Sequence, residues 1–80
     1  MTDANASIVR KRSVMIAGHR TSVSMEQAFW DVLKQLAASE GRSLGALIEE
    51  VDRNRAGNLS SALRVYVLQR LHTAIASEGP

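Results

Sequence analysis

The stretch HRTSVS, residues 19–24, decides the fold, because its surroundings predict one strand followed only by helices. It is short, rich in β-branched and polar residues, and preceded by Gly18. Ser24 and Gln27 fit the S-x-x-Q capping box that starts a helix. A strand without a partner in its own chain leaves backbone N–H and C=O groups unpaired. We therefore expect a second copy of the chain to supply the other half of a sheet.

Helical periodicity and capping residues divide the rest of the chain into three helices. Gly41 is expected to end the first helix as a left-handed residue, and Ser43 to cap the second. Asn58 or Ser60 is expected to cap the third. The predicted elements are a strand at about 19–23 and helices at about 25–39, 44–56 and 60–75, within a domain spanning 11–76.

The apolar positions of the strand and the first two helices define a core, which we expect the homodimer to bury. Trp30, at the edge of the first helical stripe, is either an interface anchor or a half-buried packing residue. The third helix is apolar on more than one side, since Val65 and Leu68 point away from its main stripe. That helix is expected to pack on its own protomer and also across the dimer, in a higher oligomer or against a partner protein. The predicted dimer core is Val23, Phe29, Leu33, Leu36, Leu47, Ile48 and Val51.

Positive charge gathers at the N-terminal end. Residues 1–25 carry four basic and one acidic side chain, whereas residues 26–80 carry six basic and seven acidic ones. Residues 1–10 are expected to be a disordered arm leading into the basic run at 10–12, and residues 77–80 a frayed tail. The basic run is either a nucleic-acid arm or a solvated tail, and the alternation of Val14 and Ile16 could extend the strand before Gly18.

The residue inventory argues against an enzyme. The two histidines lie far apart in sequence, cysteine is absent, and no metal-binding, nucleotide-binding or phosphate-loop motif occurs. No metal or other cofactor is expected. No apolar run is long enough for a membrane span or a signal segment, so a cytoplasmic protein without membrane partners is the default.

The order of strand, helix, glycine turn and capped helix resembles the ribbon-helix-helix family of Arc/MetJ-type DNA-binding proteins. The turn Gly41-Arg42-Ser43-Leu44 looks very like that between the two family helices, and Val23 looks like the inward-facing strand residue. The resemblance covers Arg12 to about Arg55, with the third helix as an addition. It implies a mostly α fold in which strands of two chains pair antiparallel into a ribbon that enters the DNA major groove.

The strand period of two then assigns roles to side chains. If Val23 faces the core, Arg20 and Ser22 point toward DNA bases, and a slip of one residue would present His19 and Thr21 instead. Arginine can read guanine through two hydrogen bonds, and serine can donate or accept. The expected phosphate contacts are Lys11 and Arg12 in the basic run and, by resemblance to the family's phosphate clamp, Arg42, Ser43 and Leu44.

The sequence thus predicts a homodimeric bacterial transcriptional regulator, a repressor that binds double-stranded DNA. The alternative is a protein-interaction or antitoxin-like module that dimerises through the ribbon and holds a partner protein on the third helix. The two differ in whether the protein shifts a DNA duplex at low salt.

Overall fold

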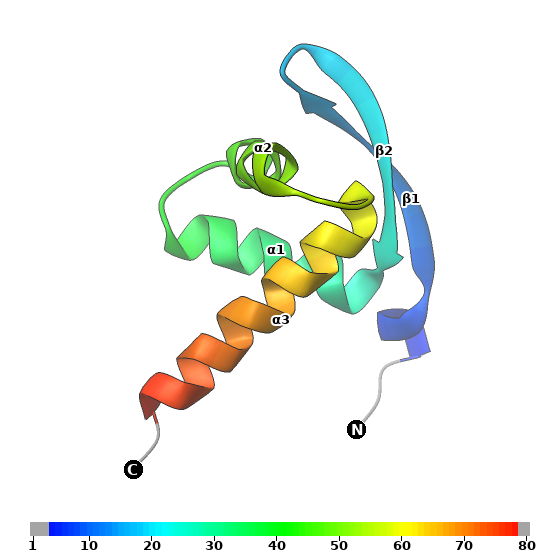
Figure 1. The fold of residues 1–80 in the computed structure, drawn as a ribbon. Helices are drawn as coiled ribbons and strands as arrows, with labels where there is room; N and C mark the ends of the chain where they lie inside the picture. Colours follow the sequence, from blue (N-terminus) through cyan, green and yellow to red (C-terminus); the bar gives the residue numbers. More distant parts are fainter. Residues whose placement is uncertain (1–3, 79–80) are drawn as a thin grey trace.

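The computed structural model describes residues 4–78, in which a β-hairpin precedes three helices (Figure 1). This order confirms the expected two-stranded antiparallel ribbon followed by three helices. A single 3-10 turn, Ala4–Ser7, leads into the hairpin. The hairpin strands are β1 (Val9–Ile16) and β2 (His19–Glu26), and the helices are α1 (Gln27–Ser39), α2 (Leu44–Asn54) and α3 (Leu59–Glu78).

The partner strand differs from the expectation, because the chain supplies it itself. β1 pairs antiparallel with β2 over its full length, with Arg12 opposite Val23 and Ser13 opposite Ser22. Ala17 and Gly18 connect the strands in left-handed conformations, with φ of 51° and 83°, as a two-residue hairpin turn requires. The backbone groups of β2 that were expected to pair with a second copy therefore pair with β1 of the same chain.

The N-terminal segment also differs from a disordered arm. Ala4–Ser7 form the 3-10 turn, and β1 starts at Val9. The Gln27 N–H donates to the Ile8 carbonyl at 3.0 Å, so the hairpin ladder reaches the start of α1. The expectations for residues 1–3 and 79–80 lie outside the described residues.

The start of α1 corrects the predicted capping box. α1 begins at Gln27, and its N-cap Glu26 makes no capping hydrogen bond through its side chain. Ser24 stays in β2, because its N–H donates to Ser60 Oγ at 2.9 Å and its carbonyl accepts from Arg64 Nη1 at 3.3 Å. Both groups come from α3, so a tertiary contact overrides the local capping signal.

Three other helix signals are confirmed, but α3 continues to Glu78 instead of ending at about 75, so residues 77 and 78 belong to the helix and not to a frayed tail. Gly41 follows α1 with φ of 67°, and the Ser43 hydroxyl accepts from the Ala46 N–H at 3.1 Å. The Asn58 side chain accepts from the Ser61 N–H at 2.8 Å and so caps α3. α2 ends at Asn54, two residues early, where Arg55 donates to Asp52 Oδ1 at 2.7 Å and to the Gly57 carbonyl at 2.7 Å and holds the turn.

One chain closes the hydrophobic core. The inner face of the hairpin, α1, α2 and the first half of α3 surround it, and Phe29 and Leu36 pack partly buried at its margin. Residues expected at a dimer interface are therefore already covered by β1 and by α3. The buried side chains are Ile16, Val23, Met25, Trp30, Leu33, Ala37, Leu47, Ile48, Val51, Leu59, Leu63 and Val67.

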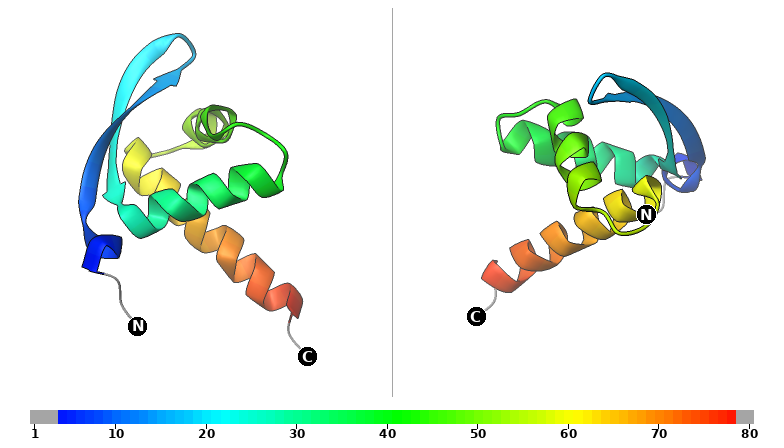
Figure 2. Two further views of the ribbon diagram at one scale, coloured as in Figure 1. Left: turned by 180° about the vertical axis from the view of Figure 1, so that it is seen from behind. Right: turned by 45° about the horizontal axis from the view of Figure 1, so that its top comes forward.

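The hairpin and α3 extend from this core in different directions. The hairpin curves over α2, and the Ala17 N–H near its tip donates to Glu49 Oε2 of α2 at 3.3 Å. α3 runs away from the hairpin, and its C-terminal half projects beyond α1 and α2 in each view (Figures 1 and 2). Two surfaces of the chain are thus left exposed, one on each extension.

Candidate nucleic-acid interface

The outward face of the hairpin carries alternate residues of both strands. Because directly opposed residues of an antiparallel pair share a face, the pairs Lys11–Ser24, Ser13–Ser22 and Met15–Arg20 lie together there. Val9 is also exposed on this face but lies beside Glu26 at the base of the hairpin. We call the other five exposed side chains the ribbon face, defined as Lys11, Ser13, Met15, Arg20 and Ser22.

The strand register matches the one in which Val23 faces the core. Val23 is fully buried, whereas Arg20 and Ser22 are exposed on the opposite side of β2. In the alternative pair, Thr21 is half-buried on the inner side opposite Val14, and His19 is exposed at the hairpin tip. Arg20 and Ser22 therefore belong to one continuous exposed face, and His19 and Thr21 do not.

The ribbon face is basic. Neither the Lys11 ammonium nor the Arg20 guanidinium has an ion pair or a hydrogen bond to another of the residues that the structure describes. Glu26 is the one acidic residue of the two strands, and it lies at the base of the hairpin, 3.8 Å from Arg64 Nη1. The two charges flank the central Ser13–Ser22 pair, which suits contacts with phosphates and base edges.

Arg12 lies on the other side of the hairpin. Its Nη2 donates to Gln27 Oε1 at 2.5 Å, and its guanidinium stacks over the Trp30 ring with Cζ 4.6 Å from the centroid. Trp30 is buried in the core. Within the chain it therefore acts as a packing residue, which is one of the two roles expected for it. Arg12 is thereby held inward by a cation–π contact and a hydrogen bond.

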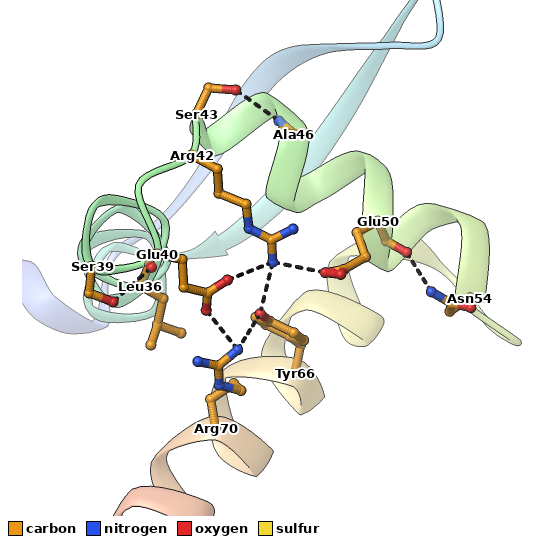
Figure 3. A network of polar contacts seen from close by, with 10 residues as sticks. All are labelled: Leu36, Ser39, Glu40, Arg42, Ser43, Ala46, Glu50, Asn54, Tyr66 and Arg70. Carbon is orange, nitrogen blue, oxygen red and sulfur yellow. Dashed lines mark hydrogen bonds and ion pairs between the residues drawn. The ribbon is translucent and has the colours of Figure 1, made fainter.

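Arg42 also pairs with side chains of its own chain (Figure 3). Its Nη2 lies 2.9 Å from Glu40 Oε1 and 2.8 Å from Glu50 Oε1, and it donates to the Tyr66 hydroxyl at 3.3 Å. Arg70 joins the cluster through Glu40 Oε2 at 2.6 Å and the Tyr66 hydroxyl at 3.0 Å. This cluster ties together the end of α1, the middle of α2 and α3.

Charge pairing in the cluster shifts two pKa values. The hydrogen bond from Arg42 lowers the pKa of the Glu50 carboxyl below its ordinary value, and the positive charges of Arg42, Arg53 and Arg70 act in the same direction. The same hydrogen bond raises the pKa of the Arg42 guanidinium further. Arg42 therefore stays charged and paired.

The start of α2 remains open to solvent. Ser43 is exposed and Leu44 half-buried, and the Ser43 hydroxyl is occupied with the N–H of Ala46. The Leu44 and Gly45 N–H groups belong to the first turn of the helix, whose amides have no acceptor inside the helix. The partial positive charge of such a turn favours an anion.

Sequence reasoning missed Ser13 and Met15. Their positions follow from the alternation of residues 11, 13 and 15 against Val14 and Ile16, followed by a glycine turn. Reading the hairpin from this pattern would have found both residues.

Two other kinds of site find no support in the described part of the chain. No group of three or more His, Cys, Asp or Glu side chains there could hold a metal ion. None of the helices within residues 4–78 combines the length and apolar character needed to cross a membrane.

Comparisons with known proteins agree with this architecture. The model of a family described as "Ribbon-helix-helix domain" matches residues 9–71. The solved structure of an uncharacterized protein from Bordetella pertussis Tohama I is similar, with a TM-score of 0.82 and 34% sequence identity. That match covers 99% of this chain and 68% of the other. No curated protein gives a significant match.

Proposed function

The chain belongs to the ribbon-helix-helix domain family, and on this premise we propose that it is a transcriptional regulator whose hairpin enters the DNA major groove. Both strands of the ribbon come from one chain. The major groove is about 12 Å wide and admits a two-stranded ribbon. The observation that carries the proposal is the exposed, basic ribbon face, on which neither cation has a partner within residues 4–78.

We assign base contacts to Arg20 and Ser22. Arg20 can donate two hydrogen bonds to the O6 and N7 atoms of guanine, and Ser22 can donate to or accept from a base edge. Ser13, directly opposite Ser22, adds a second hydroxyl at the centre of the face. The expected operator therefore contains a guanine at the position that Arg20 reaches.

We assign phosphate contacts to Lys11 and to the first turn of α2 at Ser43 and Leu44. Lys11 is exposed on the ribbon face, and the helix turn offers backbone N–H groups. Arg12 and Arg42, which the sequence also suggested, would have to leave Trp30 and Glu50 respectively to reach a phosphate. Their proposed role is to hold the hairpin and α2 in place.

We place this regulator in the bacterial cytoplasm, as a repressor that blocks its operator without a cofactor and without enzymatic chemistry. The alternative of a protein-interaction module draws on the exposed apolar side chains of α3, which include Leu68 and Ile75. A module of that kind would leave the ribbon face unused, so the DNA measurement below separates the two.

The test is a fluorescence-anisotropy titration of a labelled duplex taken from upstream of the protein's own coding sequence, across a salt series. Arg20→Ala should weaken binding by about 5- to 140-fold, as expected for loss of a paired contact to guanine. Lys11→Ala should lower the slope of log affinity against log salt by about one, through the loss of one released counterion.

Arg53→Ala is the matched control. Arg53 is exposed on α2 and away from the ribbon face, so its removal changes the net charge equally without removing a groove contact. Equal affinities for Arg20→Ala and Arg53→Ala would refute the base contact. Absence of any duplex binding by the native protein at low salt would refute the proposed function.

A further inference from the structure

Met15 is the apolar member of the otherwise polar ribbon face. Its side chain is 55% exposed and is not part of the hydrophobic core of the described residues. Its neighbours in β1, Val14 and Ile16, lie on the inner side of the hairpin and pack in or against that core. Met15 therefore presents its thioether to solvent on the surface that is proposed to face DNA.

The strand register places Met15 beside the residue that is proposed to contact guanine. Met15 lies directly opposite Arg20, at the end of the ribbon face nearest the hairpin turn. Directly opposed side chains of an antiparallel pair have Cβ atoms about 4.5–5.5 Å apart. Successive base pairs of DNA are about 3.4 Å apart along the helix axis. A ribbon that brings Arg20 to a guanine therefore brings Met15 to the same base pair or to an immediate neighbour.

Thymine is the base whose edge suits an apolar side chain. In the major groove all four bases present hydrogen-bonding groups, and thymine adds a C5-methyl group. The methionine side chain is unbranched and adapts its shape to the surface that it contacts. Covering a polar base edge with an apolar side chain costs free energy, because the base loses hydrogen bonds to water. Met15 is therefore suited to a thymine methyl group and unsuited to the other base edges.

Val9 is also exposed and apolar on this side of the hairpin, but its surroundings differ. It lies opposite Glu26, whose carboxylate repels the DNA phosphates. Met15 instead lies opposite a guanidinium that has no ion-pair partner within residues 4–78. The charge around the two side chains thus favours an apolar contact with DNA at Met15 and opposes one at Val9.

We propose that Met15 contacts the C5-methyl group of a thymine beside the guanine that Arg20 contacts, so that β1 as well as β2 determines the DNA sequence that is bound. This assignment rests on the proposed DNA contact of the ribbon face. It adds an apolar contact to the hydrogen bonds assigned to Arg20 and Ser22. The operator is expected to contain a thymine within one base-pair step of that guanine.

The test compares thymine with uracil in the DNA, because uracil lacks only the C5-methyl group. The probe is the duplex from upstream of the protein's own coding sequence, with its thymines replaced one at a time by deoxyuridine. Fluorescence anisotropy measures the affinity for each duplex. At the thymine that Met15 contacts, the replacement should weaken binding by the native protein about three- to fivefold, as expected for one buried methyl group.

The guanine that Arg20 contacts is located in the same way. Each guanine of the duplex is replaced by 7-deazaguanine, which lacks the N7 acceptor. The replacement at the contacted guanine should weaken binding by the native protein but not by Arg20→Ala. The distance between this guanine and the sensitive thymine then tests the predicted spacing.

Three variants test whether Met15 makes the methyl contact. Met15→Gln, which is similar in length but polar, should bind the thymine and uracil duplexes equally. Met15→Leu stays apolar and should keep the preference for thymine. Leu68→Gln is the matched control, because Leu68 is also an exposed apolar side chain, 64% accessible, but lies on α3. It should keep the native preference, and circular dichroism checks that all three variants are folded.

Oxidation provides a second measurement on the native chain. Hydrogen peroxide transfers one oxygen atom to the Met15 sulfur, so that the O–O bond breaks, a polar sulfoxide forms and water leaves. Met25 of β2 is fully buried and is therefore protected. The oxidised native protein should lose its preference for thymine, whereas Met15→Leu treated in the same way should keep it.

The outcomes separate this contact from the proposed function. Absence of duplex binding by the native protein at low salt would refute both. A duplex that binds but has no thymine sensitive to loss of its methyl group would overturn the methyl contact alone. A preference for thymine that persists in Met15→Gln, or a sensitive thymine more than one base-pair step from the guanine that Arg20 contacts, would overturn it as well.

Discussion

The ribbon face and the exposed apolar side chains of α3, which are Val65, Leu68, Leu71 and Ile75, are both open to solvent, but their chemistry is opposite. The ribbon face has Lys11 and Arg20 around two serines. The exposed side of α3 has four apolar side chains, and Arg70 on the same helix is paired with Glu40. A strongly charged polymer such as DNA matches the first surface through its phosphates. An apolar surface gains from burial against another apolar surface. One 80-residue chain therefore carries its proposed DNA contact and its exposed apolar side chains on different elements.

The largest expected effect is a difference in stability between substitutions in the two halves of α3. Leu63 is fully buried, whereas Leu68, further along the same helix, is 64% exposed. Leu63→Ala should lower the free energy of unfolding by about 2–5 kcal/mol at any protein concentration. Leu68→Ala should change it by no more than about 0.5 kcal/mol in dilute protein. Chemical denaturation at two protein concentrations measures both, and equal losses would mean that the distal half of α3 is part of the monomer core.

A smaller effect concerns the turn that shapes the hairpin. Ala17 has a left-handed φ of 51°, which is unfavourable for a residue with a Cβ, and asparagine tolerates this conformation better. Ala17→Asn should raise the free energy of unfolding by about 0.5–1 kcal/mol. Gly18→Ala should destabilise the protein although no atom lies within 4 Å of the new Cβ, since Gly18 has φ of 83°. Thermal melts test both variants. Stabilisation by Gly18→Ala would contradict the left-handed conformation of Gly18 in the turn.

The smallest effect is the pH dependence of the Arg42 cluster, which holds α3 on α1 and α2. The pKa of Glu50 is lowered in the folded protein, so its stabilising contribution is complete above its ordinary pKa of 4.5 and is lost as the pH falls through the folded value. Glu50→Gln should therefore flatten the fall in stability on acidification. Asp52→Asn is the matched control, because the ion-pair partner of Asp52 within residues 4–78 is Arg55, three positions further along the chain. A steeper fall in Glu50→Gln than in the native protein would contradict this role.

Local signals in the sequence predicted the helical part of the fold. Gly41, Ser43 and Asn58 mark helix ends through backbone conformation and capping, which depend on a few adjacent residues. The register of β2 also followed from its alternation, because burying Val23 fixes the opposite side as exposed.

The positions of Arg12 and Ser24 depend on contacts with residues that are distant in the sequence. A basic run at 10–12 fits either a nucleic-acid arm or a solvated tail, and the contacts with Trp30 and Gln27 explain why Arg12 turns inward while Lys11 points out. Ser24 was predicted to cap α1, but Ser60 and Arg64 of α3 bind its backbone and keep it in the strand. These partners lie up to 40 residues away, so periodicity cannot reveal them.

An amide chemical-shift titration of the ¹⁵N-labelled protein with the upstream duplex tests most directly whether the ribbon face binds DNA. The largest changes are expected on Lys11, Ser13, Arg20 and Ser22, while residues 68–76 of α3 keep their shifts. Large changes along α3 with an unperturbed hairpin would contradict this contact.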